Sequence, residues 1–131
     1  MQILQPPSWP KPKGYSNGIA ASGRLVFVSG MVGWDKDCRF VAQDFIGQAR
    51  SALENIVQVL AEAQAKPEHI VRMTWYVVDR KEYLSCGKEL GTAYREVIGR
   101  HFPAMTAVEV RGLMEEQARL EIEVTAVVPE S

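Results

Sequence analysis

Two stretches with a helical hydrophobic period, set between runs of β-branched and aromatic residues, limit this chain to folds that combine helices with a sheet. In residues 44–65 apolar side chains recur every three or four positions, which predicts an amphipathic helix with Asp44 as its N-cap. Lys66-Pro67 is expected to end it, because a residue before proline is pushed out of the α region. The same spacing returns in residues 81–100 and predicts a second helix.

The segments around these helices are of the β type. The predicted strands are residues 18–21, 24–29, 70–78, 106–110 and 120–128. A Ser22-Gly23 turn between the first two favours a hairpin. The order is therefore ββαβαββ, which is typical of an α+β chain. Because two helices can cover only one face of such a sheet, the other face needs a partner, and we expect an oligomer.

A chain of 131 residues is expected to form a single domain. Residues 1–13 are rich in proline and should run extended, without the apolar stretch that a secretory signal needs. No segment approaches the roughly 18 apolar residues of a membrane span. Cys38 and Cys86 form neither a metal-ligand pair nor a redox motif. We therefore expect a cytoplasmic protein with free thiols and no membrane partner.

The charge of the chain argues against a nucleic-acid partner. Its 15 basic and 16 acidic residues give a net charge of −1, without the basic stripe that nucleic acid attracts. The sequence also lacks a phosphate-binding glycine loop, a GxSxG motif and an HExxH motif. His69 and His101 have no second ligand at metal spacing, so we interpret both as structural or surface residues and expect no metal site.

The last predicted strand has two unlike faces. One face consists of Leu120, Ile122, Val124 and Ala126, and the other of Glu121, Glu123, Thr125 and Val127. A carboxylate on a strand that faces a subunit junction costs free energy unless it is paired or functional. By itself the pattern also fits an outer face exposed to solvent.

Several segments, in this order, resemble the Rid (YjgF) family of enamine/imine deaminases. They are Tyr15-Ser16-Asn17-Gly18, residues 25–30, residues 48–55, residues 70–74, Phe102-Pro103-Ala104, residues 107–110 and residues 120–123. The resemblance runs from about Tyr15 to Val128. It implies a chorismate-mutase-like α+β subunit with a mixed sheet and two helices on one face, assembled as a homotrimer with a cleft between each pair of neighbours. Active members of the family hydrolyse enamines and imines to ketones and ammonia without a metal or other cofactor.

Three residues that match the family's cleft are retained here. Tyr15 matches the tyrosine of the family's cleft. Ser29, which precedes Gly30, matches the serine of that cleft, and Glu121 matches the acidic residue that positions water. The resemblance implies that Glu121 acts as the base. Each position also has a structural interpretation, because Tyr15 can pack at an interface and Ser29-Gly30 can belong to a turn.

Three other positions depart from the family's pattern. Met105 stands where the deaminases carry an arginine that binds the substrate carboxylate, Ala107 where many have cysteine, and Gly91 where an asparagine often reaches the cleft. A methionine cannot replace the two charge-assisted hydrogen bonds of an arginine. Arg111 lies six residues further on and is not assumed to substitute. We therefore expect a more apolar cleft that suits the usual small imino acid poorly.

Two functions remain open. The first is hydrolysis of a small-molecule enamine or imine whose acid group is absent, masked or held elsewhere in the cleft, with Glu121, Tyr15 and Ser29 as the catalytic group and no cofactor. The second is a non-catalytic trimer that binds a small apolar metabolite or a partner protein through the same cleft. Some relatives are described as ribonucleases or translation inhibitors, which the near-neutral charge makes the less favoured alternative.

Overall fold

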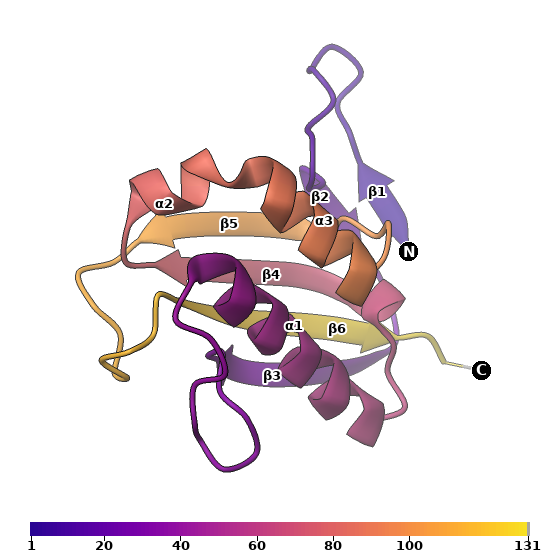
Figure 1. Cartoon of the computed structure of the whole chain (residues 1–131). Helices are drawn as coiled ribbons and strands as arrows, with labels where there is room; N and C mark the ends of the chain where they lie inside the picture. Colours follow the sequence, from indigo (N-terminus) through magenta and orange to yellow (C-terminus); the bar gives the residue numbers. More distant parts are fainter. Residues whose placement is uncertain (131) are drawn as a thin grey trace.

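A computed structural model describes residues 1–130 of the chain, and its main feature is a four-stranded sheet (Figure 1). In spatial order the strands are β3 (Arg24–Met31), β6 (Leu120–Val128), β4 (Ile70–Val77) and β5 (Ala104–Glu109). The β4–β5 pair is parallel and the other two pairs are antiparallel. The expected mixed sheet of an α+β chain is therefore confirmed.

The helices lie together on one side of this sheet, as Figure 1 shows. They are α1 (Phe45–Glu62), α2 (Arg80–Ser85) and α3 (Gly87–Val97), with the short 3-10 helix η1 (Pro67–His69) before β4. Asp44 caps α1 as predicted, because its carboxylate accepts a hydrogen bond from the Gly47 N–H at 3.0 Å. Within residues 1–130, no helix or second sheet covers the face of this sheet that is turned away from the helices.

The core lies between α1 and the inner face of the sheet. Its fully buried side chains include Leu53, Ile56, Leu60, Met73, Trp75, Leu120 and Ile122. Fully burying one leucine or isoleucine contributes roughly 1.5–3 kcal/mol, so this layer supplies most of the driving force for folding. On β6 the burial alternates as predicted, which puts Glu121, Glu123 and Thr125 on the face away from the helices.

The predicted hairpin at residues 18–29 is wrong. Strand β2 (Gly18–Ala20) pairs with β1 (Gln2–Leu4), a strand inside the N-terminal segment, in a separate two-stranded sheet. Strand β3 pairs instead with β6, which is far away in the sequence. Gly23 does not close a tight turn. It sits where a Cβ would lie 2.2 Å from the Val128 carbonyl oxygen, so it lets the chain enter the main sheet beside the end of β6.

Both predicted helices differ from the observed ones in their limits. Helix α1 ends at Glu62, five residues before Pro67, because Gln64 adopts a left-handed conformation and the Ala65 N–H bonds back to the Leu60 carbonyl at 2.9 Å. The second predicted helix is divided into α2 and α3 at Cys86, directly before Gly87. No helix within residues 1–130 is both long and apolar enough to cross a membrane.

Candidate functional site

The predicted site residues form two groups, and the first lines a cavity of about 420 Å³ between α3 and the β4–β5 part of the sheet. Tyr15, Gly91 and Met105 all contribute to its wall. The remaining lining residues are Lys13, Gly14, Trp75, Tyr83, Leu84, Gly87, Leu90, Tyr94, Arg95 and Phe102. Three positions that are 14 to 90 residues apart in the sequence are thus brought into one space.

Tyr15 reaches the cavity because the next residue is tied to the start of β5. The buried Ser16 donates its backbone N–H to the Pro103 carbonyl at 3.0 Å and its hydroxyl to the Phe102 carbonyl. These two bonds fix the N-terminal segment beside the sheet edge. Tyr15 itself stays 42% exposed, so its side chain is open to a ligand or a second subunit.

Met105 lies on the helix side of β5, directly beside Met73 of β4. It is half-buried and joins the edge of the hydrophobic core. Ala107, two residues further along the same side of β5, is exposed and does not line the cavity. Position 105 is therefore a wall of the cavity, whereas position 107 lies beyond it.

The floor of the cavity is held by aromatic contacts at the end of α3. The rings of Tyr94 and Phe102 stack with centroids 5.8 Å apart, and the Tyr94 hydroxyl donates to the His101 carbonyl at 2.6 Å. Burial raises the pKa of Tyr94, which keeps this hydroxyl a donor. His101 itself contacts the Ile70 carbonyl through Nε2 at 2.6 Å, and the Nδ1 of His69 accepts from Lys66. The interpretation of both histidines as structural is confirmed.

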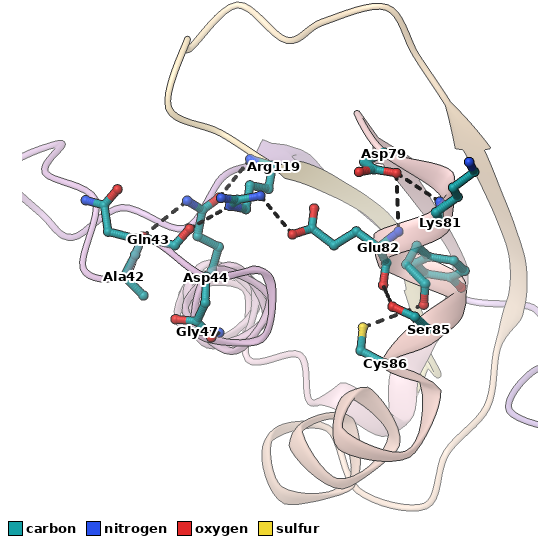
Figure 2. Close-up of polar contacts among 12 residues, drawn as sticks. Ala42, Gln43, Asp44, Gly47, Asp79, Lys81, Glu82, Ser85, Cys86 and Arg119 are labelled. Atoms are coloured by element: carbon teal, nitrogen blue, oxygen red, sulfur yellow. Dashed lines mark hydrogen bonds and ion pairs between the residues drawn. The ribbon is translucent and has the colours of Figure 1, made fainter.

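Helix α2 forms another wall, and an ion pair fixes its position (Figure 2). Arg119, at the start of β6, contacts the Glu82 carboxylate at 2.8 Å and donates through Nε to the Gln43 carbonyl at 2.6 Å. Asp79 caps the helix by accepting from the N–H groups of Lys81 and Glu82. The wall that carries Tyr83 is thus anchored to the sheet before any ligand binds.

Ser29, Gly30 and Glu121 form the second group, on the open face of the sheet. The register between β3 and β6 shifts between Val28 and Met31, and this irregularity lays Gly30 against Glu121. A Cβ at position 30 would lie only 2.1 Å from Oε2 of Glu121. The carboxylate therefore occupies the space that a side chain at position 30 would need, which explains the glycine.

The two carboxylates of β6 have different surroundings. Glu123 accepts a hydrogen bond from the Tyr76 hydroxyl at 2.6 Å, and this bond is the main reason why the pKa of Tyr76 is raised. Glu121 lies opposite Tyr76 on the neighbouring strand but has no hydrogen-bond partner within residues 1–130. Both are half-buried rather than fully solvated. Of the two, Glu121 has both carboxylate oxygens without a hydrogen bond, whereas Glu123 has one oxygen engaged with Tyr76.

The two groups face opposite sides of the sheet. Met105 pairs with Met73 on the helix side, whereas Glu121 pairs with Tyr76 on the open side. One chain alone therefore does not bring the cavity and the carboxylate together. The open face also carries large apolar side chains, among them Phe27, which is 71% exposed.

Neither a metal centre nor a second cavity offers an alternative site that contains the predicted residues. Within residues 1–130 no three side chains among His, Cys, Asp and Glu are placed to hold a metal ion. A larger cavity, of about 800 Å³, lies between α1 and the loop after β3 and contains none of the predicted site residues. Cys38 and Cys86 are free thiols, as expected.

Arg95 lines the cavity, and no pattern in the sequence had indicated it. Its guanidinium lies over Gly91, one turn earlier on α3, with Nη1 3.1 Å from the place where a Cβ at position 91 would stand. The spacing of four residues was visible in the sequence, but nothing in it showed that this face of α3 borders the cavity.

Comparison with known proteins identifies the family. Residues 9–128 match the family described as endoribonuclease L-PSP, which is the Rid (YjgF) family. The chain belongs to the Rid family. A RutC family protein of Aquifex aeolicus is 30% identical over 128 residues, which cover 97% of this chain and 99% of that protein. The 2-iminobutanoate/2-iminopropanoate deaminase of Salmonella typhimurium is 32% identical over 108 residues, 80% of each chain.

The fold of this Rid chain also has a solved counterpart. The Rid family protein YyfB of Yersinia pestis, whose function is unknown, superposes with a TM-score of 0.86 at 26% identity. The match covers 97% of this chain and 98% of that one. The resemblance to the Rid family that the sequence indicated is thus confirmed.

Proposed function

We propose that the chain hydrolyses a reactive enamine or imine to a carbonyl compound and ammonia, at a site completed between subunits of a homotrimer. One observation carries the proposal. The Tyr15 cavity and the unbonded Glu121 lie on opposite faces of the same sheet, so they meet only if a second copy packs against the first. The deaminase activity named for the Salmonella relative supports the reaction class.

The proposed reaction needs only groups that the chain supplies. An enamine first gains a proton on carbon and loses one from nitrogen, and so becomes the imine. Glu121 takes a proton from water as the water oxygen attacks the C=N carbon, and the nitrogen gains a proton from solvent to give a carbinolamine. The C–N bond then breaks, ammonia leaves with the proton that Glu121 returns, and the hydroxyl loses its proton to form the carbonyl. One water is consumed for each ammonia released.

Tyr15 and Ser29 orient the substrate in this proposal. Ser29 precedes Gly30, which lies against the Glu121 carboxylate, and Tyr15 borders the cavity, which a neighbouring subunit would present to that carboxylate. Positioned proton transfer contributes typically about 10²–10⁴-fold to a rate. That suffices for an imine, which already hydrolyses without a catalyst.

The substrate is not the usual small imino acid in this proposal. In the deaminases of the family an arginine at the position of Met105 holds the substrate carboxylate, and Met105 offers no hydrogen-bond donor. A substrate that fits must lack the acid group, carry it masked, or have it held by another residue.

Ammonia release tests the reaction. Imines made in situ by an amino-acid oxidase, or by an amine oxidase for substrates without an acid group, are presented to the protein. We expect the imine to decay faster with the protein than without it, and ammonia to appear in equal amount. A trimer that binds the carbonyl product in its cavity but accelerates no imine would favour the second function, a non-catalytic binding protein, for which the apolar Met105 is the supporting observation.

A further inference from the structure

The cavity beside Met105 has a positive lining. Arg95 and Lys13 both contribute to its wall, and none of the lining residues that the structure describes is acidic. The rest of the wall is apolar or aromatic, apart from the hydroxyl groups of the tyrosines. Lys13 and Arg95 are both exposed, so solvent weakens their field, but two cations without a carboxylate still favour an anionic ligand over a neutral one.

Arg95 makes no ion pair within residues 1–130. The nearby Glu96 is engaged with Arg50, and the only other ion pair of these residues joins Arg119 to Glu82. The single hydrogen bond of the Arg95 guanidinium goes to the Thr92 hydroxyl at 3.5 Å, which is long and weak. Most of the donors of this planar group are therefore free to bind a ligand.

Gly91 leaves room beside the Arg95 guanidinium, which a Cβ at that position would displace by a few tenths of an ångström. Side chains on a helix lean toward its N-terminus, so Arg95 extends over position 91. Nη1 would come within 3.1 Å of a Cβ at that position, which is a tight contact. Gly91 stands where the family resemblance implies an asparagine, and its lack of a side chain leaves space beside Arg95.

From these contacts we infer that Arg95 is the carboxylate-binding residue of this chain, and that the ligand is a carbonyl-type compound with a carboxylate held on the α3 side of the cavity. The inference deepens the proposed function and rests on it for the reacting end of the ligand. Position 105 lies on the sheet and Arg95 lies on the helix above it. Arg95 would therefore hold a carboxylate at a different place from an arginine at position 105. Because these two places differ, the ligand that we infer has a spacer between its acid group and its carbonyl carbon, unlike a small 2-imino acid.

Binding of an unreactive ketone tests this inference apart from catalysis. The probes are 4-oxopentanoate, which has two carbons between carbonyl and carboxylate, and its methyl ester, which has the same shape without the charge. Dissociation constants come from NMR titrations that follow the amide signals of Gly91 and Met105. We expect wild-type protein to bind the acid at least about tenfold more tightly than the ester, the lower end for bonds to an exposed charged group.

Three variants show which residue is responsible. Arg95→Gln should remove the preference for the acid, whereas Arg95→Lys should keep part of it, since the charge remains without the two parallel donors. Arg111→Gln is the matched control, because Arg111 is exposed and outside the cavity wall, and it should keep the full preference. The same spectra show whether each variant is folded, and Arg95 has no structural ion pair to lose.

A wild-type protein that does not distinguish the acid from the ester would overturn the inference. So would a preference that survives in Arg95→Gln, or one that is lost in Arg111→Gln instead. Acid preference without any ammonia release would overturn the proposed hydrolysis and leave the Arg95 site standing. Ammonia release without acid preference would support the proposed hydrolysis and overturn the Arg95 site.

Discussion

At the scale of single residues, Glu121 and Met105 carry the chemical argument. Both carboxylate oxygens of Glu121 lack a hydrogen bond within residues 1–130, whereas Glu123, the other carboxylate on that face, accepts from the Tyr76 hydroxyl. Met105 gives the cavity wall no cation at the position where the family resemblance implies an arginine. Arg95 contributes a cation to the same wall from helix α3. The proposed hydrolysis depends on Glu121, and the proposed choice of substrate depends on Met105 and Arg95.

Glu121→Gln should leave the assembly intact and lower turnover by at least about tenfold, because the amide keeps the shape of the side chain but cannot take a proton. Turnover is measured as ammonia released from an imine generated in situ. Glu123→Gln is the comparison variant, and it should retain most of the activity because that carboxylate is bonded to Tyr76. Equal losses in the two variants would mean that the charge of the face matters and not the base at position 121.

Met105→Arg should raise the hydrolysis of small imino acids such as 2-iminopropanoate, which wild-type protein is expected to process poorly. The missing charge-assisted bonds are worth about 1.5–3 kcal/mol, which corresponds to about 10- to 150-fold in kcat/KM. Recovery should be incomplete, because Ala107 and Gly91 also differ from the family's pattern. The measurement is the decay of the imine with each protein. Efficient wild-type turnover of these acids would show that another residue already binds their carboxylate in the productive position.

At the scale of elements, α3 has conflicting demands. A helix is stabilised by alanine rather than glycine, yet α3 contains Gly91 in its middle, at the place where Arg95 crosses it. Helix α2 shows the opposite arrangement, since the Asp79 cap and the Arg119–Glu82 ion pair hold it firmly (Figure 2). The α2 wall of the cavity is therefore held in place by polar contacts. The α3 wall contains a glycine that lowers helix stability but leaves space beside Arg95.

Gly91→Ala should separate these two demands. The free energy of unfolding should rise by up to about 1 kcal/mol from helix propensity, because position 91 lies inside a helix. The added Cβ should push the Arg95 guanidinium from its place and lower the preference for 4-oxopentanoate over its ester. Urea denaturation and the NMR titration give the two quantities. A variant that is more stable and binds the acid as tightly as before would contradict the role given to this glycine.

At the scale of the whole molecule, the sheet has one covered and one open face. Figure 1 shows the helices on one side only, and the open side carries Phe27 and Leu25 as exposed apolar side chains beside the carboxylates. Apolar surface of this kind on a sheet is stabilised when it is buried against another copy. Threefold packing would also bring the Glu121 group of one chain to the Tyr15 cavity of the next.

The chain should therefore run as a homotrimer, with about three times the subunit mass of 14.6 kDa in light scattering coupled to size exclusion. Phe27→Glu should break the assembly, because it places a charge on the apolar part of the open face, and ammonia release should fall with it. Circular dichroism is the control, since an exposed residue is not needed for the fold of the subunit. An active monomer would contradict the proposal that the site lies between subunits.

The sequence by itself determined the approximate places of the main helices and strands and the two faces of most of β6, because hydrophobic periodicity is a local property that burial on one side imposes on each element. It missed β1 and the division between α2 and α3. It also indicated the family, and through that resemblance it named Tyr15, Ser29 and Glu121 as candidate site residues. Only the tertiary structure decided which strands pair, since β3 bonds to β6 across nearly the whole chain and not to its neighbour β2. Arg95 was hidden for the same reason. A lone arginine on a helix is usually a solvated surface residue, and its position in the cavity becomes visible only when α3 is packed above β5 and Gly91 is seen to make room for it.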